Sequence, residues 1–301
     1  MNSLIFRLMT CLSLVIAVIA WSAVADAYPR KERTDAIKWF REGAEGGSSE
    51  AQFHLGTMYD AGKGVHRNFA EAAMWYLKAA NQGHVAAQYN LGGLYLLGQG
   101  VPRDFAEAAR WFRKAADQGH VAAQYNLALL YARGQGVPQD YTEAVKLYRE
   151  AGESGNAAAQ YNLALLYEQG RGVPQDYTKA AEWYRKAAEL GYAAACNNLG
   201  IAYAEGHGVQ QDFPEAVGWY RKAAELGYAI AQSNLALMYG AGRGVAQDDV
   251  LAYAWLAVAA AGGYQGAEAA RAALEQRLTD EQIAEGRAKA RELMKTIKAR
   301  R

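Results

Sequence analysis

Three groups of residues in this sequence have types and spacings that could support chemistry, and the first is glycine-rich. Segments of the form Gly-x-Gly-Val recur six times, and glycine-rich loops can cradle phosphate. None ends in the Gly-Lys-Ser/Thr of a phosphate-binding loop, and none follows a predicted strand, so we interpret them as turns. They occupy Gly62–Val65, Gly98–Val101, Gly134–Val137, Gly170–Val173, Gly206–Val209 and Gly242–Val245.

The second group is a column of aspartates spaced 36 residues apart, and paired carboxylates can perform general acid–base catalysis. That chemistry requires two carboxylates within a few ångströms, whereas equivalent positions of stacked repeats do not usually converge. Each aspartate directly precedes a predicted helix, so we interpret the column as helix N-caps. Its members are Asp104, Asp140, Asp176, Asp212 and Asp248.

The third group is the histidines, which are His54, His66, His84, His120 and His207. No two of them are four residues apart, and no cysteine or carboxylate cluster accompanies them at metal-ligand spacing. His84 and His120 share one column with Asn156, which indicates a surface or packing role. No Gly-x-Ser-x-Gly elbow or Cys–His nucleophile pair is present either. We therefore expect no catalytic residue, no metal site and no cofactor.

The composition of the chain indicates a folded protein and argues against nucleic-acid binding. Apolar residues make up 51% of the 301 residues and the formal net charge is +1, so the chain can bury a core and lacks the basic excess of a nucleic-acid binder. The mature chain is predicted to keep one cysteine, Cys196, which replaces glutamine inside an alanine-rich helix. We expect a packed, inert thiol there.

Residues 1–25 have the pattern of an export signal. Arg7 is followed by an apolar run from Leu8 to Val24, and Ala23-Val24-Ala25 is a small-residue cleavage box that overlaps a second one, Ala25-Asp26-Ala27. Cleavage predicts a periplasmic or secreted protein. The alternative is an uncleaved anchor in the inner membrane with the chain facing the periplasm, since the run is just long enough to span a bilayer.

Internal repetition determines the predicted fold. Six blocks of 36 residues align without a gap, at residues 49–84, 85–120, 121–156, 157–192, 193–228 and 229–264, and residues 33–48 form a leading half-repeat. In the second block, Ala87, Leu91 and Tyr95 share one face of a first helix, which stops at Gly98. Asp104 and Glu107 predict a capping box that opens a second helix, and an apolar stripe including Trp111 follows it.

The pattern A-x-x-x-L-G/A-x-x-Y-x-x-G-x-G-V-x-x-D-[FY]-x-x-A-x-x-W-[FY]-x-x-A-A-x-x-G resembles the Sel1-like repeat, a relative of the tetratricopeptide repeat. The resemblance implies an all-α fold, a right-handed superhelix of helix-turn-helix repeats whose concave groove binds proteins or peptides. Exported bacterial members of this kind often take part in envelope assembly, signalling or host contact. Some cysteine-rich relatives have been proposed to bind or hydrolyse β-lactams, but the paired cysteines of that group are absent here.

Residues 265–301 leave the repeat and are predicted to be capping helices. Thr279 and Gln282 form a capping box before a helix with Ile283 and Ile297 on its apolar side. The other side is basic, with Arg287, Lys289, Arg291, Lys295, Lys298, Arg300 and Arg301. We interpret it as a solvated cap, and contact with anionic lipid is the weaker alternative.

The candidate ligand groove lies on the first helices. An asparagine column lies at the helix centres, and asparagine is a mediocre helix former whose amide can read a peptide backbone. Alternatively, each asparagine bonds to a neighbouring repeat or to a glycine-rich loop. Tyrosines lie beside this column, and a more variable column marks specificity. These residues are Asn90, Asn126, Asn162, Asn198 and Asn234; Tyr89, Tyr125 and Tyr161; and Arg133, Gln169 and Glu205, with Ala61, Leu97 and Ala241 at the same position.

The predicted function is therefore an exported, non-enzymatic scaffold that binds an envelope protein or peptide. A second hypothesis is a factor that binds glycans or envelope polysaccharide, because rows of Tyr and Trp can stack on sugars. The tryptophans follow core spacing, which weakens that hypothesis, and a β-lactam-interacting hydrolase is a distant third. The tryptophan column is Trp75, Trp111, Trp183, Trp219 and Trp255.

Overall fold

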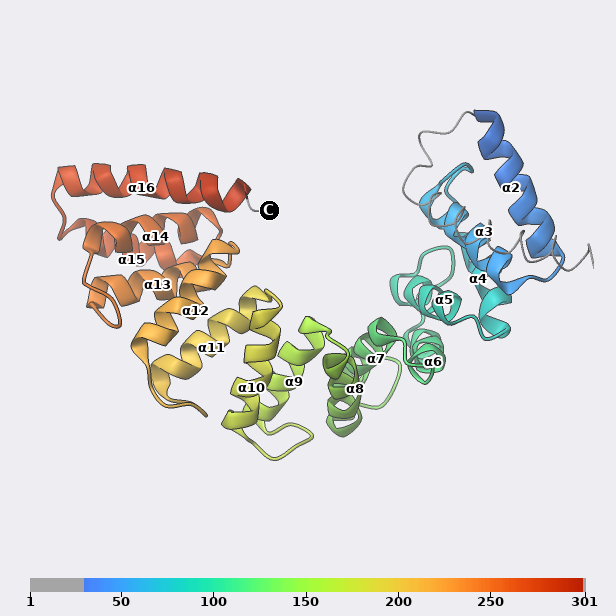
Figure 1. Cartoon of the computed structure of the whole chain (residues 1–301), viewed down its shortest axis with the longest axis horizontal. Coiled ribbons are helices and arrows are strands. Elements are labelled where there is room, and N and C mark those ends of the chain that lie inside the picture. The colour runs from blue at the N-terminus through green and yellow to red at the C-terminus, as the bar shows by residue number, and fades with distance from the viewer. Residues whose placement is uncertain (1–29, 300–301) are drawn as a thin grey trace, which may run out of the picture. The chain divides into compact units, whose positions relative to one another are not determined.

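The computed structural model describes residues 30–299, which form fifteen α-helices and no strand (Figure 1). The prediction of an all-α array of helix-turn-helix repeats is confirmed. The predicted export signal, residues 1–25, lies outside the described residues. The helices are α2 (Arg30–Glu45), α3 (Ser49–Ala61), α4 (Phe69–Asn81), α5 (Val85–Leu97), α6 (Phe105–Ala116), α7 (Val121–Arg133), α8 (Tyr141–Glu153), α9 (Ala157–Gln169), α10 (Tyr177–Glu189), α11 (Ala193–Glu205), α12 (Phe213–Glu225), α13 (Ala229–Ala241), α14 (Asp249–Ala261), α15 (Gln265–Glu275) and α16 (Asp280–Ala299).

The chain divides into two compact units. The N-terminal unit extends to Ala123 and includes Gln135–Val137, and the C-terminal unit comprises Gln124–Gly134 and Pro138–Arg301. Helix α7 begins in the first unit and continues in the second. Within each unit a repeat is one helix pair, such as α5 with α6 or α9 with α10.

The acidic column caps the second helices, as predicted. Asp104 precedes α6 in extended conformation, and its carboxylate accepts from the backbone N–H groups of Ala106 at 2.8 Å and Glu107 at 3.0 Å. These bonds satisfy donors that have no partner inside the helix. Each second helix begins one residue after such a cap. The caps are Asn68, Asp104, Asp140, Asp176, Asp212 and Asp248.

A capping box at Asp104 also predicts that the side chain of Glu107 accepts a hydrogen bond from the backbone N–H of Asp104, and this part of the prediction is wrong. Its backbone N–H donates to the carbonyl of Tyr95 at 3.0 Å, so it is not available to the Glu107 side chain. Glu107 instead accepts from Arg110 at 2.7 Å. The loop therefore ties the start of the second helix to the end of the first, a contact that local sequence spacing does not reveal.

The second glycine of each Gly-x-Gly segment lies against the preceding repeat. Gly100 has φ +70°, and a Cβ built on it would lie 2.2 Å from the carbonyl carbon of Phe69. Gly208 repeats this geometry in the C-terminal unit, with φ +73° and a Cβ position 2.1 Å from the carbonyl oxygen of Tyr177. Positive φ and close backbone approach both require glycine here. The interpretation of these segments as turns agrees with this geometry.

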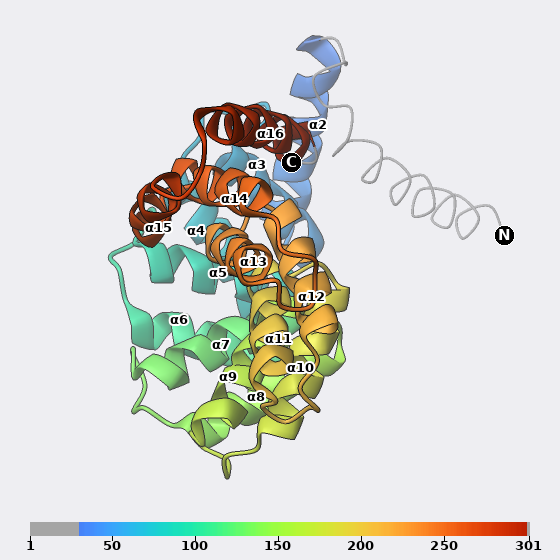
Figure 2. The same cartoon turned by 90° about the vertical axis from the view of Figure 1, so that its left-hand side faces the viewer.

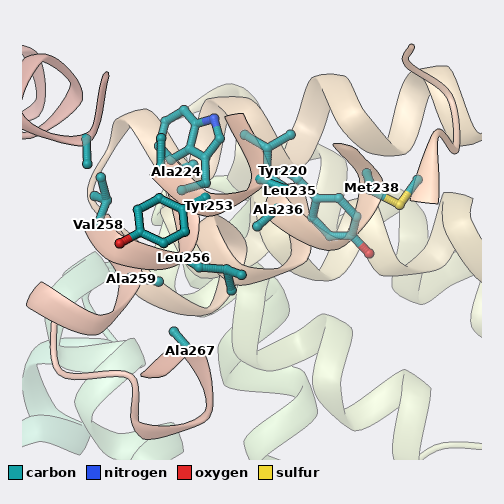
Figure 3. Close-up of a cluster of buried hydrophobic side chains, with 14 of the residues drawn as sticks. Tyr220, Ala224, Leu235, Ala236, Met238, Tyr253, Leu256, Val258, Ala259 and Ala267 are labelled. Atoms are coloured by element: carbon teal, nitrogen blue, oxygen red, sulfur yellow. The ribbon is translucent and has the colours of Figure 1, made fainter. Parts of the chain in front are cut away.

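Aromatic and alanine side chains form the core of each unit. In the N-terminal unit, Tyr76, Leu91 and Trp111 are almost fully buried, and burying side chains of this size contributes about 1.5–3 kcal/mol each. In the C-terminal unit, the cluster around Tyr253 and Leu256 is drawn in Figure 3.

The C-terminal helices complete the second core. Helices α15 and α16 both pack against α14, and Figure 2 shows them beside it. Ala290 and Ile297 of α16 are buried in the cluster around Tyr253. The predicted capping box opens this helix, since Thr279 N–H donates to Gln282 Oε1 at 2.9 Å and Gln282 N–H donates to Thr279 Oγ1 at 3.3 Å. Among the helices of residues 30–299, none has the length and apolar character to cross a membrane.

Candidate ligand-binding face

The predicted asparagines lie half-buried at the centres of the first helices. In the N-terminal unit, Asn90 hydrogen-bonds the hydroxyl of Tyr76, which belongs to the second helix of the preceding repeat. That hydroxyl also donates to Asp60 at 3.1 Å. Burial and then Asp60 raise the pKa of Tyr76, while Asn90 acts in the opposite direction. Asn90 therefore joins one repeat to the next.

Two asparagines of the C-terminal unit make the same kind of connection. Asn162 hydrogen-bonds the hydroxyl of Tyr125 on α7, and Asn198 hydrogen-bonds Tyr161 on α9 and Tyr184 on α10. Burial is the largest cause of the raised pKa values of all three tyrosines, and each asparagine lowers its partner's pKa in part. These amides lie between consecutive repeats.

The column continues as a chain of amides on α11 and α13. Asn234 Nδ2 donates to Asn197 Oδ1 at 2.9 Å, and Asn197 Nδ2 donates to Asn198 Oδ1 at 3.2 Å. Asn126 is also half-buried. A ligand would meet these asparagines through whichever amide donors and acceptors the repeats do not already use. Ligand binding by the asparagine column stays a prediction.

The three candidate tyrosines are half-buried, Tyr89 in the N-terminal unit and Tyr125 and Tyr161 in the C-terminal unit. Tyr89 stacks on His120 with ring centroids 4.6 Å apart, and Tyr161 lies against Tyr192 at 5.0 Å. His120 and Tyr192 each precede a first helix of the following repeat. These contacts hold the rings of Tyr89 and Tyr161, and all three tyrosines stay partly exposed, which suits amphipathic side chains at interfaces.

The histidine column has a structural role that the sequence only partly indicated. His84 Nδ1 accepts from Ala87 N–H and His120 Nδ1 accepts from Ala123 N–H, both at 3.2 Å, so both rings act as helix N-caps. Asn156 makes the equivalent bond to Ala159 at 2.9 Å. Burial lowers the pKa of His120. A neutral ring is required, because a protonated Nδ1 cannot accept a hydrogen bond.

This cap predicts a pH dependence. Because the pKa of His120 is lower in the folded chain than in the unfolded chain, the unfolded chain binds the proton more tightly. The contribution of this cap to the free energy of unfolding is therefore fully present above the pKa of the unfolded chain, and it is lost as the pH falls through the lower pKa of the folded chain. We expect H120N to keep the cap and to lose less stability than the unmodified chain between pH 7 and pH 5. H120A should cost about 0.5–1 kcal/mol at pH 7, at the lower end for a cap because the His120 carbonyl also accepts from Ala123. Urea denaturation at both pH values measures this, and equal pH slopes for H120N and the unmodified chain would contradict it.

A single carboxylate, that of Glu50, lies beside two of the histidines. Glu50 lies 2.9 Å from Nε2 of His54, which follows it by one helical turn, and 3.2 Å from Nε2 of His84. The two histidines come from neighbouring repeats, so the spacing of histidines alone could not show this trio. Within residues 30–299, no group of three or more potential ligands is arranged to hold a metal ion.

The variable column is exposed at every repeat. It occupies the last residue of each first helix, immediately before the αL glycine that ends the helix. Arg133, Gln169 and Glu205 change from positive to neutral to negative along the C-terminal unit, and the charge of Arg133 lowers the pKa of Tyr125, whose shift is dominated by burial. Glu205 also lies 3.1 Å from His207. The full column is Ala61, Leu97, Arg133, Gln169, Glu205 and Ala241.

The Sel1 repeat family model matches the chain in seven consecutive segments. The chain belongs to the Sel1 repeat family. The matched residues are 29–48, 49–84, 85–120, 121–156, 157–192, 193–228 and 229–264. Sel1 and tetratricopeptide-like repeats generally mediate protein–protein interactions, and Sel1 repeat proteins are typically non-enzymatic scaffolds.

Solved structures include other Sel1 repeat proteins. A Sel1 repeat protein from Oxalobacter formigenes is 34% identical, with 76% of this chain and 94% of that chain covered and a TM-score of 0.63. The protein c5321, a protective antigen present in uropathogenic Escherichia coli strains, is 32% identical, with 88% and 72% covered and a TM-score of 0.41. Yeast Tom70 is 16% identical, with 85% and 62% covered and a TM-score of 0.48. No curated protein matches the chain.

The first helices of these Sel1 repeats also carry a column of buried glutamines, which are Gln52, Gln88, Gln124, Gln160 and Gln232. Gln52 Nε2 donates to the carbonyl of Ala44 at 3.0 Å, and Gln88 repeats the bond to Ala80 at 3.1 Å. Both of these buried amides thus satisfy a carbonyl in the last turn of the preceding helix, whereas Gln124 donates to Glu150 instead. Cys196 stands in this column, buried, with its thiol 3.6 Å from the Ala188 carbonyl, and burial raises its pKa. The expected packed thiol agrees with this position. The column was visible in the sequence, but its partners eight residues upstream were not anticipated.

The tryptophans of the Sel1 repeats are core residues. Trp75, Trp111, Trp183 and Trp255 are buried, and Trp219 is half-buried. Lysine ammonium groups lie over several of these rings, as Lys186 does at 3.9 Å from Trp183. Sugar stacking needs an open aromatic face, so this column offers little surface for the glycan hypothesis.

Proposed function

We propose that this Sel1 repeat protein is an exported, non-enzymatic adaptor that binds a protein or peptide of the cell envelope. The proposal rests on the protein-binding role of the repeat family and on the export pattern of residues 1–25. The near-neutral charge of +1 argues against nucleic acid as the partner.

The variable column is the observation from which we infer which residues contact the partner. A scaffold selects its partner through exposed side chains that differ between repeats, because identical positions cannot distinguish one sequence from another. Arg133, Gln169 and Glu205 meet this condition, and the half-buried tyrosines supply amphipathic contact area next to the same helices. The partner segment is therefore expected to carry an acidic group where it meets Arg133 and a basic group where it meets Glu205.

Charge reversal at the variable column tests the proposal. The unmodified chain and an R133E/E205R variant are used to capture proteins from envelope extract, and the partner retained by the unmodified chain is then titrated against both. We expect the double change to weaken binding at least about tenfold, because it places like charges opposite each other at two points.

A matched control makes the same charge changes on the second helices. Lys146 of α8 and Glu182 of α10 are exposed in the C-terminal unit, so K146E/E182R, like R133E/E205R, reverses one positive and one negative charge and leaves the net charge unchanged, but at residues outside the variable column. Binding by this control should stay within about twofold of the unmodified chain. Equal weakening by both double variants, or by neither, would refute the assigned face.

A further inference from the structure

A pocket lies in the C-terminal cap, and none of its lining residues belongs to the candidate ligand-binding face. Its volume is about 480 Å³, and residues of α14, α15 and α16 line it. These three helices lie together at the red end of the chain in Figure 2. The volume falls in the range of small-molecule sites, which is about 300–1,000 Å³. The repeat pattern does not predict this pocket, because α15 and α16 lie outside the repeats.

Three arginines line the pocket, and two of them belong to the basic side of the C-terminal helix. Arg287 and Arg291 come from α16 and Arg271 comes from α15. Arg287 Nε donates to the hydroxyl of Tyr253 at 3.2 Å, and that hydroxyl donates to Glu275 at 2.7 Å. The tyrosine and the glutamate therefore fix one guanidinium at the wall of the pocket.

The neighbouring carboxylates do not fully use these guanidinium groups. Glu275 Oε1 is 3.9 Å from Arg271 Nε and 3.8 Å from Arg287 Nη2, and Glu268 is 3.9 Å from Arg271 Nη2. These are ion pairs beyond hydrogen-bond length. The Nε of Arg271 is buried and has no hydrogen-bond partner among the described residues. A buried donor without a partner is costly, so this atom indicates an acceptor that the chain itself does not provide.

Apart from Glu268, which pairs with Arg271, the remaining wall is apolar. Ala257, Ala260 and Ala290 are small side chains that leave room, and Met294 is a flexible, polarisable side chain that adapts to irregular ligands. An inorganic anion would leave this surface unused. A ligand with an anionic head and an apolar body would use both parts of the pocket.

We propose that the pocket of the C-terminal cap binds a small amphiphilic carboxylic acid. Its carboxylate pairs with the guanidinium groups of Arg271 and Arg291, and its apolar body lies against the alanines and Met294. Three guanidinium groups and two carboxylates leave one uncompensated positive charge, which a carboxylate matches and a phosphate dianion exceeds. Guanidinium forks also suit the planar geometry of a carboxylate.

Calorimetric titration of the purified chain with a series of eight-carbon compounds tests this site. Octanoate should bind saturably with one site per chain, and octanol and octylammonium at least about tenfold more weakly, because they lack the anionic head. Octyl phosphate should bind no more tightly than octanoate. Equal affinities for octanoate and octanol, tighter binding of octyl phosphate, or no saturable binding of octanoate at millimolar concentration would each overturn the proposal.

Arginine replacements locate the binding. R271Q and R291Q should each weaken octanoate binding about tenfold, and Arg291 is exposed, so its replacement leaves the core intact. K298Q removes the same charge from an exposed residue of α16 that does not line the pocket, and it should bind octanoate within about twofold of the unmodified chain. Undiminished binding by both arginine variants, or equal loss in K298Q, would show that the pocket is not the site.

Discussion

Replacement of Gly208 by alanine is expected to lower the free energy of unfolding by about 2–4 kcal/mol. Two costs combine at this residue. Its φ of +73° is unfavourable for any residue with a Cβ, and the new methyl group would lie 2.1 Å from the Tyr177 carbonyl oxygen. Backbone cannot move aside as a flexible side chain can, so the junction between the fourth and fifth repeats must shift. Urea denaturation followed by circular dichroism measures the change.

G191A is the matched control, because it separates the two costs. Gly191 has a similar φ of +81° but no atom within 4 Å of its Cβ position. It should lose only about 1 kcal/mol, the cost of the left-handed conformation. If G208A and G191A are destabilised equally, the close contact contributes nothing and the repeat junction is looser than the structure indicates.

Replacement of Asn162 and Asn198 together by alanine is expected to cost stability before it costs binding. Their side chains hydrogen-bond Tyr125, Tyr161 and Tyr184, so each change leaves half-buried hydroxyl groups with fewer partners. The expected loss is about 1–3 kcal/mol per site. Thermal and urea melts measure the loss, and the envelope partner captured by the unmodified chain provides the binding assay.

The control for this experiment is Q169A, which removes an exposed amide from the same helix as Asn162. It should change stability by less than about 0.5 kcal/mol. The opposite outcome for the asparagine pair is equally clear: an unchanged melting temperature with roughly thirtyfold weaker capture would make the column a ligand site, since two lost hydrogen bonds of about 1 kcal/mol each have that effect.

Features set by neighbours in the sequence could be predicted, and the caps are the clearest case. An aspartate before a helix needs only the N–H groups two and three residues later, so Asp104 was identified correctly. Thr279 and Gln282 were identified for the same reason. The 36-residue period predicted the array of helix pairs because every repeat must bury the same apolar face.

Features set by the contact between repeats could not be predicted. The reciprocal bond from Glu107 fails because Tyr95, in the previous helix, already accepts the N–H of Asp104. Glu50 meets His54 one turn along the same helix, but it meets His84 only because two repeats bring them together. The hydrogen-bond partners of the asparagine column could not be predicted for the same reason. Periodicity shows which face of a helix a residue lies on, but it does not show which atoms of the neighbouring repeat contact that face.

The glycine contact at each junction has an evolutionary consequence. Gly100 meets backbone atoms of Phe69 and Ala70, and Gly208 meets backbone atoms of Tyr177 and Thr178. Because backbone is the same in every repeat, the contact does not depend on which side chains the preceding repeat carries. As far as this contact is concerned, duplication or recombination of whole 36-residue units can lengthen or reorder the array without a change of the glycine or of the residues it meets. A gain or loss of fewer residues would displace the glycine from its contact, which accounts for six blocks that align without a gap.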